Sequence, residues 1–163
     1  MNKKNIIQRV LQHLSTELKA TELAANNAHL AAIDDQSIAE TQYDTVAIEA
    51  GYLAEGQSKR VDVIKNSIAL FEQFYVRELK SSPTIVIGSL VQLEKGITNS
   101  NWLFIAPAAG GFRCVVEENN ITVITPHSPM GQALINKEVN DEVSLLINGL
   151  TTAENIDYIH SII

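Results

Sequence analysis

Two apolar stripes with coiled-coil spacing run through the first half of the chain, and they limit what it can fold into more than any other feature. Small or apolar residues recur at alternating steps of four and three, interrupted only by Thr21 and Gln57. The first stripe is Ile7, Leu11, Leu14, Leu18, Thr21, Ala25, Ala28 and Ala32; the second is Tyr43, Ala47, Ala50, Ala54, Gln57, Val61, Ile64, Ile68, Phe71 and Tyr75. Two such stripes, here together called the seam, predict an antiparallel coiled-coil hairpin over residues 1–79.

The size of the seam residues changes along the predicted hairpin. Large side chains lie at the chain-end side, and alanines dominate toward the polar break near residues 33–40. Small residues let two helices approach closely, so we expect a slim tip at this break. At 1.5 Å per residue, an arm of roughly 30 residues reaches about 45 Å.

The second half of the chain has a different composition. All four prolines and six of the eight glycines lie after residue 80. Turn signals at Lys95-Gly96, Gly110-Gly111 and Glu118-Asn119-Asn120 separate apolar runs. These runs predict strands at 84–94, 101–107, 112–117, 121–125, 142–147 and 156–163. Ser128-Pro129 predicts the start of a short helix over 128–136. We therefore expect a small antiparallel sheet with one helix over residues 80–163, which makes the fold class α then α+β.

Negative charge gathers where the two halves of the hairpin meet. From Asp34 to Glu55 there are six carboxylates and no Lys or Arg. Such a run is commonly a solvated helix face, and Asp34 or Asp35 can also cap the second helix. The alternative is that the carboxylates meet a cation, and the residues alone leave both interpretations open.

Overall composition excludes several function classes. The formal net charge is −7 with a pI near 5.0, which argues against non-specific nucleic-acid binding. Lys and Arg do not cluster with aromatic residues, so we expect no sequence-specific nucleic-acid contact. The single cysteine, Cys114, cannot form an internal disulfide. No signal peptide or membrane-spanning stretch is evident, so we expect a cytoplasmic protein without membrane partners.

A segment of the second half resembles a known family. ITVITPHSPMGQALINKEVNDEVSL, residues 121–145, is similar to the C-terminal domain of the Gre family of bacterial transcript cleavage and elongation factors. The matching pieces are Ser128-Pro129, the run Ala133 to Lys137, and the run Val139 to Val143. The resemblance implies an FKBP-like C-terminal domain after the coiled-coil hairpin.

The resemblance also implies a partner and a mechanism. Members bind bacterial RNA polymerase, with the globular domain at the rim of the secondary channel and the hairpin inside it. Tip carboxylates help hold Mg²⁺ in the polymerase's own active centre, which stimulates cleavage of a backtracked transcript. The protein would not itself be an enzyme and would bind no cofactor tightly. The metal-directed candidates are Asp34, Asp35, Glu40 and Asp44, and the polymerase-contact candidates are Ser128, Pro129 and Met130.

The tip departs from the family pattern. Cleavage-competent members carry an acidic residue, two spacers and then Glu-Asn, whereas here Glu40 lies five positions after Asp35. Two other interpretations stay open for this reason. One is a Gre-like channel-binding regulator or inhibitor without cleavage stimulation, and the other is a coiled-coil protein–protein interaction module.

Overall fold

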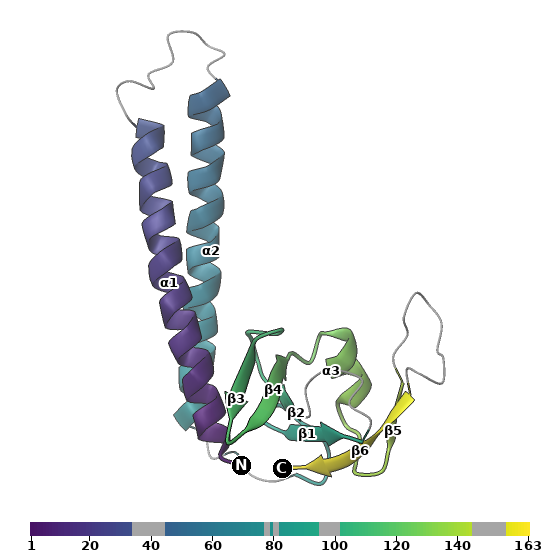
Figure 1. Ribbon diagram of the computed structural model, residues 1–163. Coiled ribbons are helices and arrows are strands. Elements are labelled where there is room, and N and C mark those ends of the chain that lie inside the picture. The colour runs from purple at the N-terminus through teal and green to yellow at the C-terminus, as the bar shows by residue number, and fades with distance from the viewer. Residues whose placement is uncertain (34–44, 77–78, 80–81, 95–101, 145–155) are drawn as a thin grey trace. The chain divides into compact units, whose positions relative to one another are not determined.

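The computed structural model describes residues 1–33, 45–76, 79, 82–94, 102–144 and 156–163. Two long helices come first, α1 (Lys3–Ile33) and α2 (Thr45–Val76) (Figure 1). They are followed by β1 (Leu90–Leu93), β2 (Trp102–Ile105), β3 (Arg113–Val116), β4 (Asn119–Ile124), α3 (Pro129–Leu134), β5 (Glu142–Ser144) and β6 (Ile156–Ile162). This order confirms the α then α+β fold class.

The chain forms two compact units that do not divide where the sequence composition changes. The hairpin unit is Leu11–Ala69, and the sheet unit is Met1–Val10 together with Leu70–Ile163. The predicted boundary at residue 79 marks the change from helical to strand sequence. The sheet unit nevertheless includes the start of α1 and the end of α2, because residues such as Ile6 and Phe74 are buried in it. The rings of Phe74 and Phe104, for example, lie 6.3 Å apart between centroids.

The predicted seam is confirmed wherever the structure describes its side chains. In the hairpin unit, Leu14, Thr21, Ala28, Val61 and Ile64 are buried. The remaining described seam residues of that unit, Leu11, Leu18, Ala25, Ala54, Gln57 and Ile68, are partly buried. The side chains of Ala32, Tyr43, Ala47 and Ala50 lie outside the described residues. Thr21 is accommodated because its hydroxyl donates to the Glu17 carbonyl oxygen at 2.8 Å.

The sheet has the order β3-β4-β2-β1-β6-β5 and is mixed, so the prediction of a purely antiparallel sheet is wrong. β2 and β4 pair in parallel, with Trp102 opposite Ile121, and the other pairs are antiparallel. The cause is that β3 and β4 form a hairpin in which β4, not β3, lies beside β2. Two successive reversals of the chain leave β4 running in the same direction as β2.

The predicted strand at 84–94 is too long, because only Leu90–Leu93 pairs as β1. Gly88 has a φ of +99°, and the amide of Ser89 donates to the Val86 carbonyl oxygen, which forms a turn. Ile85 is buried because it is held against the chain just after α3. Its amide donates to the Lys137 carbonyl oxygen, and its carbonyl oxygen accepts from the Asn136 amide. The apolar run before β1 is therefore not a paired strand: Ile85 packs in the core, whereas Val86 and Ile87 are exposed.

The turn predicted at Glu118-Asn119-Asn120 lies slightly earlier. Glu117 and Glu118 form the two-residue turn between β3 and β4, with φ of +50° and +65°. Two successive positive φ values match the twist that a tight hairpin needs. Asn119 begins β4, and its side-chain amide donates to the Glu117 carbonyl oxygen at 2.8 Å. The turn predicted at Gly110-Gly111 is confirmed, whereas Lys95-Gly96 lies outside the described residues.

Candidate functional site

The metal-directed candidates belong to the segment that joins the two long helices. Asp34, Asp35, Glu40 and Asp44 all lie within residues 34–44, outside the described residues. The chain leaves α1 at Ile33 and enters α2 at Thr45, so these carboxylates belong to the connection between the two arms. Their donor chemistry fits Mg²⁺, which prefers hard oxygen ligands.

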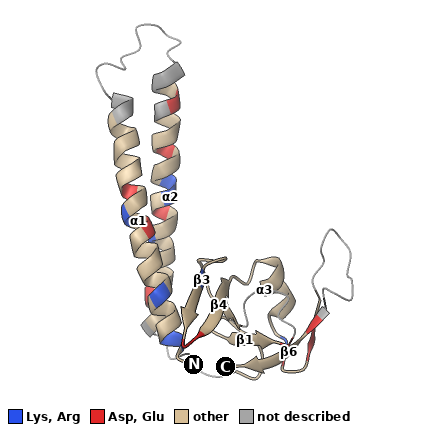
Figure 2. Ribbon diagram, viewed as in Figure 1, with Lys and Arg blue, Asp and Glu red and all other residues tan. Residues whose placement is uncertain are grey.

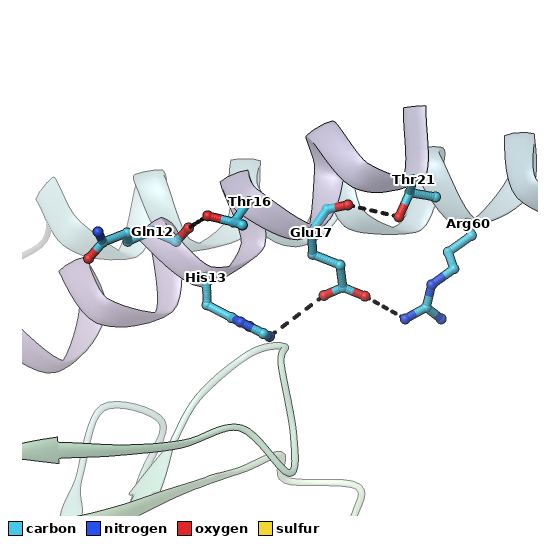
Figure 3. Close-up of polar contacts among 6 residues, drawn as sticks. All are labelled: Gln12, His13, Thr16, Glu17, Thr21 and Arg60. Atoms are coloured by element: carbon cyan, nitrogen blue, oxygen red, sulfur yellow. Dashed lines mark hydrogen bonds and ion pairs between the residues drawn. The ribbon is translucent and has the colours of Figure 1, made fainter. Parts of the chain in front are cut away.

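The arms that lead to this connection are tied by charged side chains across the hairpin. Arg60 of α2 donates to the Glu17 carboxylate of α1, and Lys65 lies 2.9 Å from Glu22. Figure 3 shows the Glu17 carboxylate between Arg60 and His13. One of its oxygens faces Arg60, and the other lies 3.8 Å from the His13 Nε2. Glu17 and Glu22 flank Thr21 in the sequence, and Arg60 and Lys65 flank Val61 and Ile64, so these ion pairs run along the buried seam.

Charge is distributed unevenly along the arms. Figure 2 shows acidic and basic residues on both helices. In the sequence, Glu22 is the last Asp, Glu, Lys or Arg of α1. Residues 23–33 carry no Asp, Glu, Lys or Arg. The carboxylates of the connecting segment are therefore preceded by an uncharged stretch of helix.

Ser128 begins α3, as the sequence predicts. Its hydroxyl accepts a hydrogen bond from the Gly131 amide at 3.0 Å and donates to the Thr125 carbonyl oxygen at 2.7 Å. Pro129 follows at the first helical position and is exposed. Both residues are therefore fixed by local geometry in a loop whose proline faces solvent.

Met130 differs from its two neighbours. Its side chain is buried in the core cluster of the sheet unit, together with Leu134 and Ile159. Of the three predicted contact residues, Pro129 is thus exposed and Ser128 is partly exposed, whereas Met130 is buried. The predicted contact with a partner is not tested by this arrangement.

Gly131 is a residue that sequence reasoning missed. A Cβ at this position would lie 2.0 Å from the Thr125 carbonyl oxygen and 3.0 Å from the Pro126 Cα. Only glycine lets the first turn of α3 approach the 125–126 backbone so closely. The signal was available in the sequence as a glycine two residues after the start of a short helix.

The Ser-Pro loop lies beside the Gly110-Gly111 turn because β2 and β4 are parallel. The Ala106 amide donates to the Ile124 carbonyl oxygen at 2.9 Å, directly after the two strands end. A Cβ on Gly110 would lie 3.1 Å from the Thr125 methyl group. Parallel pairing therefore brings two loops, far apart in the sequence, to the same edge of the sheet.

The second half of the resembling segment has a structural role. The Glu138 amide donates to the Asp141 carboxylate at 2.8 Å, and the Asn140 amide donates to the Ile159 carbonyl oxygen at 2.8 Å. Asn140 adopts a φ of +71°, which asparagine tolerates better than most residues. The segment from Val139 to Asp141 is thus a turn that leads the chain into β5, which begins at Glu142.

Other chemistry is not assembled among the described residues. No group of three or more His, Cys, Asp or Glu in this part of the chain could hold a metal ion. No described helix is both long and apolar enough to cross a membrane. Cys114 is half-buried in β3, and burial raises the pKa of its thiol, while Arg9 acts in the opposite direction. The raised pKa keeps this thiol protonated near neutral pH, which fits a packing residue.

Comparison with known proteins gives similarity to solved structures alone. No protein-family model matches the sequence, and no curated protein sequence matches it. The GreA factor homolog 1 (Gfh1) of Thermus thermophilus is 17% identical, with 94% of each chain covered and a TM-score of 0.32. A structure of the transcription factor Gfh1 is 18% identical, covering 93% of this chain and 92% of the other at a TM-score of 0.36. The Gfh1 of Thermus aquaticus is 20% identical, with the same coverage and a TM-score of 0.33.

Proposed function

We propose that this protein is an accessory factor of bacterial RNA polymerase that acts through the secondary channel. The observation that carries the proposal is the hairpin: two helices of 31 and 32 residues with a continuous described seam, joined by a segment with four carboxylates. Helices of this length reach about 45 Å, and a slim pair of them suits insertion into a narrow channel. The choice of RNA polymerase as the partner rests on the resemblance of residues 121–145 to the Gre family.

The sheet unit would bind at the rim of the channel. Its contribution is the Ser-Pro loop, in which Ser128 is held by two hydrogen bonds and Pro129 is exposed. A loop fixed in this way loses little conformational entropy on binding.

At the tip, Asp34, Asp35 and Glu40 would hold Mg²⁺ or orient its water, and Asp44 would support them. When bound in the polymerase's active centre, the ion supplies a metal-activated water for phosphodiester hydrolysis. The protein would lend carboxylates and not catalyse the reaction by itself. The displaced spacing of Asp35 and Glu40 favours one second candidate, a channel-binding regulator that does not stimulate cleavage.

Transcript cleavage in a stalled, backtracked polymerase complex with Mg²⁺ tests the proposal. The protein is compared with an Asp34→Asn/Asp35→Asn/Glu40→Gln variant and with Glu49→Gln, a matched control at an exposed carboxylate on α2. We expect faster cleavage that the triple variant loses and the control retains, while all three bind polymerase. Binding with unchanged or slower cleavage supports the regulator, and no binding overturns both.

The contact at the rim is tested separately with Pro129→Ala. Pro129 is exposed and donates no backbone hydrogen bond, so its replacement changes the surface more than the stability. We expect weaker binding to polymerase with an unchanged circular dichroism spectrum. Undiminished binding by this variant would remove the loop from the proposed contact while leaving the hairpin in it.

A further inference from the structure

The outer side of α2 carries a second stripe, separate from the seam. Ile48, Tyr52 and Val63 are 50%, 71% and 63% exposed. At about 100° per residue, these three residues and the pair Glu55 and Lys59 fall within about 80° of arc, on the opposite side from the buried Val61 and Ile64. We call these five residues the outer stripe. Large apolar side chains that are this exposed on one helix face are a common mark of an interaction surface.

Two glycines flank the outer stripe. Gly51 and Gly56 lie on either side of it, and a Cβ at either position would meet nothing within 4 Å. Glycine is less favourable than alanine in a helix interior. The other arm of the hairpin therefore gives no packing reason for either glycine, and a close approach from outside would give one.

The charges within the outer stripe indicate what approaches. Glu55 and Lys59 form an ion pair at 2.7 Å, and the hydrogen bond from Lys59, together with its charge, lowers the pKa of Glu55. A second, antiparallel copy of α2 would place its Lys59 beside Glu55 and its Glu55 beside Lys59. A parallel copy would instead set like charges against each other.

The same antiparallel register fits the rest of the stripe. Glu55 and Lys59 are equally far from Gln57 along the helix, and so are Gly51 and Val63. Val63 of the second copy would thus lie at the level of Gly51, on the flank of the stripe that carries Tyr52. The exposed apolar residues and the charges are matched by one two-fold arrangement.

We propose that the outer stripe of α2 binds a second copy of this chain, antiparallel and with the two-fold axis near Gln57. The proposal is independent of the proposed function. Two helices in contact along this stripe bury on the order of 1,000 Å² in total, which is below the roughly 1,200–2,000 Å² of a standard interface. The dimer is therefore weak, with a dissociation constant of about 10–500 µM.

Sedimentation equilibrium of the full chain over this concentration range tests the proposal. We expect the wild type to dimerise, and Glu55→Lys and Lys59→Glu each to weaken self-association by at least about tenfold, because each variant gathers four like charges at the axis. An equimolar mixture of these two variants should associate again, because each then supplies the charge that the other lacks. Lys19→Glu, an exposed change on α1, is the control and should leave association unchanged.

A second variant separates contact from charge. Gly51→Leu favours the helix of the single chain but adds a bulky side chain at the edge of the outer stripe, where a second helix would approach. We expect it to abolish dimerisation while helicity at 222 nm is kept. A wild type that stays monomeric throughout the range, or a charge mixture that does not associate, overturns the proposal.

Discussion

The sheet unit and the hairpin unit are held together by different means. One core cluster of the sheet unit contains ten buried residues among those that the structure describes, every one of them larger than alanine. The seam of the hairpin unit toward the connecting segment instead contains Thr21, Ala25, Ala28, Ala54 and Gln57. At about 25 cal/mol per Å² of buried apolar surface, the second set contributes much less to stability than the first.

This difference shows what each unit is built for. The sheet unit stabilises a fixed surface, including the Ser-Pro loop. The hairpin unit keeps two long antiparallel helices side by side in spite of a thin core, with help from Glu17–Arg60 and Glu22–Lys65. A slim pair of arms is what a chain needs when reach matters more than stability. Single substitutions should therefore be costly in the sheet unit and mild in the hairpin unit.

The largest effect is expected for Gly131→Ala. The new Cβ would lie 2.0 Å from the Thr125 carbonyl oxygen, so the backbone must shift. We expect a loss of about 4 kcal/mol of unfolding free energy. The fluorescence of Trp102, the only tryptophan, reports this in urea because it lies in β2. Gly111→Ala, where a Cβ meets nothing within 4 Å but φ is +91°, is the control and should cost about 1–2 kcal/mol.

The next largest effect is expected for Leu134→Ala. Leu134 is fully buried in the core of the sheet unit, and its removal leaves a cavity. We expect a loss of about 3 kcal/mol, again measured by Trp102 fluorescence in urea. Ala133→Gly, at a partly buried neighbour in α3, should cost about 1 kcal/mol. Equal losses for the two variants would mean that Leu134 is not a core residue.

In the hairpin unit, the sign of the effect reverses for Gln57→Leu. Gln57 is a partly buried polar residue on the seam, and leucine would add apolar contact there. We expect the unfolding free energy of the hairpin unit to rise by about 1 kcal/mol. The thermal transition followed by circular dichroism at 222 nm should move to a higher temperature, while the transition followed by Trp102 fluorescence should not change. A destabilised hairpin would show instead that Gln57 fixes the register of the two arms. The polar residue on the seam would then select one alignment of the helices at the expense of stability.

The two units also differ in how far the sequence predicts them. The seam follows from spacing alone, because contacts in a coiled coil repeat with the helical period and every described seam residue is at least partly buried. In the sheet unit, strand positions were predictable but pairing was not. Periodicity gives no partner for a strand, so the parallel pairing of β2 and β4 depends on long-range packing that no local pattern records.

The candidate site shows the same limit. Ser128 at the start of α3 follows from the known preferences of serine and proline. The burial of Met130 could not be predicted. In a helix of only six residues, a shift of one position decides whether a side chain lies in the core or at the surface. The close approach at Gly131 depends on where the Thr125 backbone passes, which is again set by the sheet.

The smallest effect, and the most direct test of how the hairpin unit is held, is expected for Glu17→Gln. The change keeps the shape of the side chain but removes the charge that faces Arg60. Because the Arg60 side chain is 63% exposed, we expect a loss of only about 0.5 kcal/mol, measured at 222 nm. The difference should shrink as salt rises from about 0.05 to 0.5 M, since exposed charges are screened. Glu72→Gln, at an exposed α2 carboxylate, is the control and should change less. A loss as large as that of Leu134→Ala would mean that charge, not the seam, holds the arms together, and the contrast between the two units would then lie in the kind of contact and not in its strength.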